Sequence, residues 1–130
     1  MIKAVGPRIS LPISPAVVAG NIFFATNVPV DLQTGNFVGG SIEAQTRQVL
    51  GNLETLLREA GGSLSDVAQI TVYLVDAKDV VGMNKVYAEF FAKEPYPSRA
   101  TVVVNELIGP PGARVEVTTQ AYLQIGRAHV

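Results

Sequence analysis

The sequence predicts an α+β fold in which two helices cover one face of a mixed β-sheet. Two stretches, 42–60 and 80–91, repeat apolar residues at the three- and four-residue spacing of amphipathic helices. Shorter stretches rich in β-branched and aromatic residues, which favour strands, lie at 21–26, 67–75, 100–104 and 114–124. With a hairpin after the first of these, the predicted order is β-β-α-β-α-β-β.

The first predicted strand, NIFFAT at 21–26, is followed by VDLQTGNFVGG, a segment rich in turn residues. We predict that this segment forms a hairpin with Gly35 at positive φ.

The first helix is predicted to begin at an N-cap, Ser41, with Glu43 in its first turn, and to end at the glycine pair 61–62. The segment 76–79 opens the second helix, and the prolines at 95 and 97 end it.

The last predicted strand has one apolar and one mixed face. Alternation places Val115, Val117, Thr119, Ala121 and Leu123 on the first, and Glu116, Thr118, Gln120 and Tyr122 on the second. Two helices cannot cover both faces of a sheet. We therefore predict that another copy of the chain buries the mixed face, which makes the protein a homo-oligomer.

Composition excludes several kinds of site and partner. The net charge of −1 provides no basic surface for nucleic acid or membranes. There is no cysteine, and the one histidine is His129, so metal and nucleophile sites that need these residues are not expected. No apolar run approaches the ~18 residues that span a bilayer. Without a secretory signal, we expect a cytoplasmic or organelle-matrix protein.

We expect a single domain over 1–124. The remaining residues, IGRAHV at 125–130, match the translation of a common sequencing adapter, and we expect them to be such a scar or a frayed tail.

From about Pro12 to Leu123 the chain resembles the Rid family of reactive intermediate deaminases, also called the YjgF family. The resemblance lies in the block SIEAQTRQVLGNLETLLREAGGSLSDVAQITVYLVDAKDVVGMNKVYAEFF and in PSRATVVV and ARVEVTTQAYL. It implies a chorismate-mutase-like two-layer sandwich, trimeric around a central barrel, with clefts between subunits. It also implies hydrolysis of reactive 2-imino or enamine acids to 2-keto acids and ammonia, without metal or cofactor.

The resemblance also implies roles for individual residues. Arg99 matches the arginine that binds the substrate carboxylate, and Glu116 matches the acid that handles the attacking water or departing ammonia. Asn84 and Thr101 match residues near the substrate, where many members have cysteine in place of Thr101. Thr26 matches the position of a hydroxyl-bearing serine of the family.

Ile13 departs from the family pattern. The family reads Gly-Pro-Tyr-Ser-x-Ala where this chain reads LPISPA, so Ile13 replaces the tyrosine that closes the pocket. The change makes the pocket mouth more apolar. It leaves two alternatives to a deaminase: a non-catalytic trimer that binds small carboxylates, as a sensor or partner protein, and a hydrolase of a bulkier substrate.

The residues themselves support the same chemistry. A guanidinium can bind the carboxylate of a 2-imino acid through two hydrogen bonds, and a carboxylate can relay a proton. The competing interpretation is that Arg99 and Glu116, on adjacent elements, form an ion pair with each other. For Asn84 the alternative is a hydrogen-bonded polar residue beside the core. We assign Tyr87 to the core.

Overall fold

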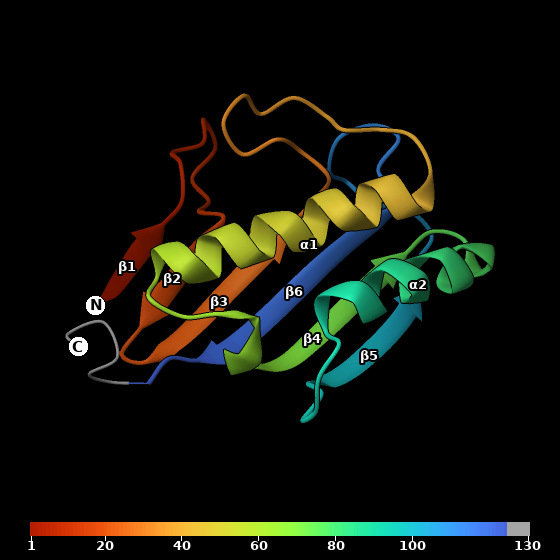
Figure 1. The fold of residues 1–130 in the computed structure, drawn as a ribbon. Coiled ribbons are helices and arrows are strands. Elements are labelled where there is room, and N and C mark those ends of the chain that lie inside the picture. Colours follow the sequence, from red (N-terminus) through yellow and green to blue (C-terminus); the bar gives the residue numbers. More distant parts are fainter. Residues whose placement is uncertain (125–130) are drawn as a thin grey trace.

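The computed structural model describes residues 1–124 and shows two helices packed on one face of a six-stranded sheet (Figure 1). The strands are β1 (Ile2–Val5), β2 (Ala16–Ala19), β3 (Ile22–Asn27), β4 (Val67–Leu74), β5 (Ser98–Val103) and β6 (Val115–Tyr122), and the helices are α1 (Ile42–Glu59) and α2 (Val80–Phe90). Single 3₁₀ turns, η1 (Leu64–Asp66) and η2 (Ala77–Asp79), precede β4 and α2. The predicted α+β class is confirmed.

The order of strands across the sheet is β1-β2-β3-β6-β4-β5. All neighbouring pairs are antiparallel except β4 and β5, which are parallel and joined through α2. The sheet is therefore mixed, as predicted. Strand β5 occupies one edge and β1 the other.

The start of the chain differs from the prediction. Strands β1 and β2 were not predicted, because each has only four residues and neither shows a clear alternation of apolar and polar residues. The predicted hairpin after β3 adds no strand and leaves a single bridge between Val30 and Phe37. The reason is that β3 already pairs with β2 and β6, so it has no free edge. Gly35 does take positive φ, at 75°.

The predicted boundaries of α1 are confirmed. The Ser41 hydroxyl accepts a hydrogen bond from the Ala44 backbone N–H at 3.1 Å, which caps the first turn. The helix runs to Glu59 with Ala60 as its C-cap, and Gly61 follows with a φ of 89°. That conformation favours glycine, which explains why the glycine pair stops the helix.

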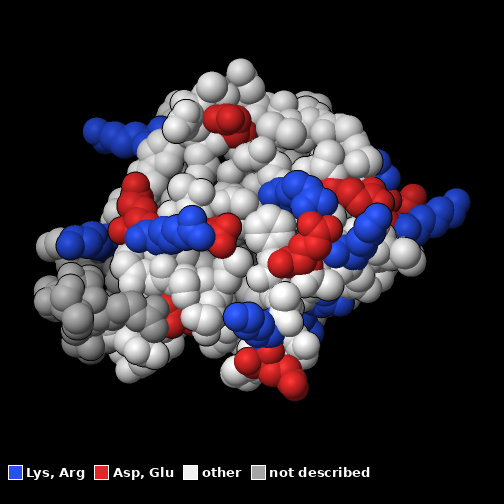
Figure 2. Space-filling model, viewed as in Figure 1, with Lys and Arg blue, Asp and Glu red and all other residues white. Residues whose placement is uncertain are grey.

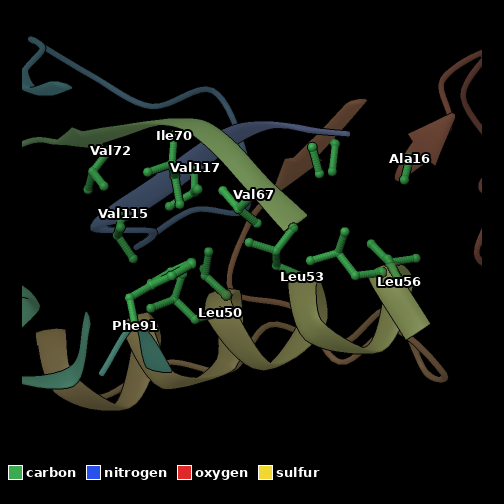
Figure 3. Packing of buried hydrophobic residues seen from close by; sticks show 14 of the residues in the cluster. Ala16, Leu50, Leu53, Leu56, Val67, Ile70, Val72, Phe91, Val115 and Val117 are labelled. Atoms are coloured by element: carbon green, nitrogen blue, oxygen red, sulfur yellow. The ribbon is translucent and has the colours of Figure 1, made fainter. Parts of the chain in front are cut away.

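The core lies between the two layers (Figure 3). Leu50, Leu53 and Leu56 project from α1 toward the sheet, whose side of the core includes Ile70, Val72 and Val117. The residues of β6 from Val115 to Ala121 alternate between buried and partly or fully exposed, so the predicted assignment of its two faces is confirmed. The helices leave the second face of the sheet uncovered.

The surface on the helix side carries acidic and basic side chains side by side (Figure 2). Among them, Arg47 of α1 and Glu89 of α2 form an ion pair at 2.6 Å, which raises the pKa of the guanidinium and lowers that of the carboxyl. No basic patch stands out on the face that Figure 2 shows.

Candidate functional site

Arg99 lies on the edge strand β5, and its side chain turns toward α2. The register pairs it with Ile70, which faces the core. Its guanidinium carbon lies 4.6 Å from the centroid of the Tyr87 ring, and its Nη1 lies 3.9 Å from the sulfur of Met83. None of the ion pairs formed within residues 1–124 includes Arg99. The guanidinium is exposed at the sheet edge and has no acidic partner in the described part of the chain.

Glu116 lies on the opposite face of the sheet from Arg99. The two residues pair with different positions of β4: Arg99 with Ile70, and Glu116 with Tyr73. Positions three apart on a strand point to opposite faces. The ion pair considered from the sequence is therefore wrong, and so is the placement of the two residues on adjacent elements, because β4 lies between β5 and β6.

Glu116 is half-buried on the face that the helices leave open. Burial raises the pKa of its carboxyl above the ordinary value. A carboxyl with a raised pKa is more often protonated near neutral pH, and it exchanges protons more readily there than an exposed glutamate does.

This burial has a measurable consequence for stability. Because the folded chain raises the pKa of Glu116, it binds the proton more tightly than the unfolded chain does. The resulting stabilisation is present below the ordinary value of 4.5 and is lost as the pH rises through the raised pKa. Glu116→Gln cannot ionise, so at pH 8 it should melt about 1–3 °C above wild type, and at acidic pH the difference should vanish.

Thermal melts between pH 4 and pH 8 check this expectation, with Glu94→Gln, at an exposed carboxylate, as the control. A Glu116→Gln variant that melts below wild type at pH 8 would show that the ionised carboxylate is instead well stabilised.

Thr101 and Asn84 lie on the same side of the molecule as Arg99. Thr101 follows Arg99 by two residues on β5 and therefore shares its face. Its hydroxyl is buried and has no hydrogen-bond partner in the described structure. Asn84 is exposed on α2, one turn before Tyr87.

Ile13 and Thr26 lie elsewhere. Both line a cleft of about 900 Å³, formed by the loops 7–15 and 28–35 and by the segment 108–110. The Ile13 side chain is 59% exposed at this cleft. Thr26 also borders a smaller hollow of about 270 Å³ on the open face of the sheet, where it pairs with Thr118.

The six predicted residues therefore fall into three places on one chain. Arg99, Thr101 and Asn84 lie at the edge formed by β5 and α2, Glu116 lies on the open face, and Ile13 and Thr26 line the cleft at the far end of β3. Arg99 and Glu116 cannot meet across the sheet within one chain. A site that uses both must combine residues from more than one copy.

Sequence reasoning did not recognise two residues beside Arg99. It assigned Tyr87 to the core, whereas the structure places its half-buried ring under the guanidinium. Met83 is one of the apolar residues whose spacing predicts the helix at 80–91. Met83 and Tyr87 are four residues apart, so the sequence places both on one side of α2. Their contact with Arg99 could not be predicted, because it depends on β5 lying against that side of the helix.

Within residues 1–124, no group of three or more His, Asp or Glu side chains is arranged to hold a metal ion. His129 and the predicted tail 125–130 lie outside the described residues. None of the helices in the described part is long and apolar enough to cross a membrane. The expected compartment stays a prediction.

Comparison with known proteins identifies the family. The family model for Endoribonuclease L-PSP matches residues 5–123. A RutC family protein of Pyrococcus horikoshii is 46% identical over 112 residues, which cover 85% of this chain and 86% of that protein. The chloroplastic Reactive Intermediate Deaminase A of Arabidopsis thaliana is 37% identical over 113 residues, or 86% of this chain and 59% of that protein.

A solved structure shows the same fold. E. coli TdcF with bound serine superposes with a TM-score of 0.83 at 29% identity, covering 94% of this chain and 99% of TdcF. The match of the family model over nearly the whole chain and the identity to the RutC and Rid relatives agree with the resemblance seen in the sequence. The chain belongs to the Endoribonuclease L-PSP family, the group that includes the YjgF, RutC and Rid proteins.

Proposed function

We propose that the protein hydrolyses reactive 2-imino or enamine acids to 2-keto acids and ammonia, in a site completed by two copies of the chain. One observation carries the proposal: an exposed guanidinium without an acidic partner in the described chain, and a half-buried carboxyl with a raised pKa on the opposite face of the sheet. The names of the relatives support it, since one of them is a reactive intermediate deaminase.

The proposed reaction begins with the substrate carboxylate. Arg99 binds this carboxylate with two N–H donors and so fixes the neighbouring C=N carbon. Water attacks that carbon while Glu116 of another copy accepts a proton from the water, and the electron pair of the C=N bond moves to nitrogen. Glu116 then donates this proton to the nitrogen, which gives a carbinolamine. Glu116 next accepts the proton of the carbinol hydroxyl and passes it to the amine, so that the C–N bond breaks as the carbonyl forms and ammonia leaves. Proton transfer of this kind contributes about 10²–10⁴-fold.

We further propose a homotrimer in which the open faces of three sheets surround a central barrel. The open face carries Phe24, Val102 and Tyr122, whose exposed fractions of 38%, 39% and 52% are high for large apolar side chains. Burial of this face against other copies would remove apolar surface from water. A light-scattering mass of three chains would support this assembly, and a mass of one chain would contradict the shared site.

The ligand class is also supported by TdcF, whose structure contains bound serine. Serine carries a carboxylate next to a carbon that bears nitrogen, which are the two groups that the proposed site must bind.

The test is a coupled assay. An amino-acid-consuming enzyme that releases 2-iminobutanoate is run with semicarbazide, which traps the imine. The protein should lower the rate of semicarbazone formation in proportion to its concentration. Unchanged trapping at high protein concentration would reject the deaminase function.

A second candidate is a non-catalytic module that binds small carboxylates in the same place. Ile13 favours it, because a 59% exposed apolar side chain offers no hydrogen bond to a reacting group. Calorimetry with 2-oxobutanoate separates the two candidates. Binding without turnover in the coupled assay would select the binding module.

A further inference from the structure

The guanidinium of Arg99 rests on an aromatic surface rather than against a carboxylate. The distance of 4.6 Å from its carbon to the centroid of Tyr87 lies within the range of a cation–π interaction. Tyr87 in turn stacks on Phe91, with ring centroids 4.7 Å apart and an angle of 30° between the planes. Phe91 is 7% exposed and belongs to the core. The two rings therefore connect Arg99 to the core.

This support leaves the polar edge of the guanidinium available. An ion pair with a protein carboxylate would occupy N–H donors, whereas a ring attracts the cation through its π-electrons. The other neighbour, the Met83 sulfur at 3.9 Å from Nη1, is a weak acceptor. Arginine in such a setting keeps its charge and its donors for a ligand while losing side-chain freedom before the ligand arrives.

We infer that Tyr87 is a positioning residue for carboxylate recognition: its ring holds the Arg99 guanidinium in the orientation that receives the substrate. The inference rests on the function proposed above, because it assigns to Arg99 a carboxylate ligand.

The ring, and not the hydroxyl, carries this role. The Tyr87 hydroxyl is buried and has no hydrogen-bond partner in the described structure. Burial raises the pKa of the phenol, while the charge of Arg99 lowers it to a smaller extent, so the ring stays neutral at physiological pH. Phenylalanine would keep the same aromatic face. An aliphatic residue would fill part of the space but would not attract the cation.

The experiment compares KM in three variants. Tyr87→Leu should raise KM for 2-iminobutanoate about 3- to 30-fold, with a smaller change in kcat. Tyr87→Phe should restore most of this loss. Phe90→Leu removes a ring from the same helix, where it packs against the core, and should leave KM unchanged. If Tyr87→Leu unfolds, Tyr87→Met serves the same purpose.

A calorimetric readout separates positioning from simple packing. The dissociation constant of 2-oxobutanoate should rise in Tyr87→Leu by the same factor as KM, whereas that of 2-oxobutanamide, which lacks the carboxylate, should not change. Equal losses for both compounds, or an equal loss in Tyr87→Phe, would overturn the inference.

The two proposals can fail separately. A wild-type protein that binds 2-oxobutanoate without turnover rejects the deaminase function but still permits the test of Tyr87. An active enzyme whose Tyr87→Leu variant keeps the wild-type KM rejects only the role of Tyr87. Wild type that neither binds nor turns over rejects both.

Discussion

Replacing Arg99 by alanine should lower kcat/KM for 2-iminobutanoate by about 10²–10⁴-fold, because two charge-assisted hydrogen bonds to the substrate carboxylate are lost together. Arg99→Lys should recover part of the loss, since an ammonium keeps the charge but not the paired geometry. The coupled imine assay measures both. Arg47→Ala is the matched control, because Arg47 pairs with Glu89 on the helix surface and should not affect turnover. Equal activity in Arg99→Ala and wild type would remove Arg99 from the site.

The same variant tests whether the site is shared between copies. Arg99→Ala and Glu116→Gln should each be nearly inactive alone. When the two variants are refolded together in equal amounts, about one quarter of wild-type activity should return. Arg99 is intact in half of the chains and Glu116 in the other half, so about one interface in four combines an intact Arg99 with an intact Glu116. No recovery after mixing would mean that both groups at a site come from one chain, contrary to their positions on opposite faces of the sheet.

Leu53→Ala should lower the free energy of unfolding by about 2–5 kcal/mol. Leu53 is fully buried between α1 and the sheet, so the substitution leaves a cavity beneath the middle of the helix (Figure 3). Urea unfolding at a fixed protein concentration measures the loss, since assembly would otherwise change the apparent stability. Thr55→Ala, at an exposed position of the same helix, should change stability by less than about 0.5 kcal/mol. A similar small effect at Leu53 would contradict the assigned core.

The sequence predicts the central elements of the fold because their patterns are long. The 18 residues of α1 and the eight of β6 show several complete periods of apolar residues, which identifies both the element and its buried face. Strands β1 and β2 have four residues each, too few for a period to appear. Their existence depends on pairing with each other and with β3, which is a tertiary property.

The sequence proposes residues for the candidate site but does not give their geometry. The resemblance identifies Arg99 and Glu116, and alternation places Glu116 on the mixed face of its strand. Strands next to each other in the chain usually pair, which favours the expectation that the two residues are neighbours. Here β4 inserts between β5 and β6, and its register decides that Arg99 and Glu116 face opposite ways. The contact of Arg99 with Tyr87 depends on the same arrangement.

If the proposed site is shared between copies, the placement of Arg99 and Glu116 on opposite faces of the sheet makes its activity depend on protein concentration. An isolated chain would then contain both Arg99 and Glu116 but hold them on opposite faces of its sheet, and it would be inactive. Specific activity would then fall on dilution, once subunits spend more time apart than associated, and a ligand that bridges two chains would hold them together. The concentration of this protein in the cell would then affect the reaction rate in two ways: through the number of chains and through the fraction of chains that are assembled.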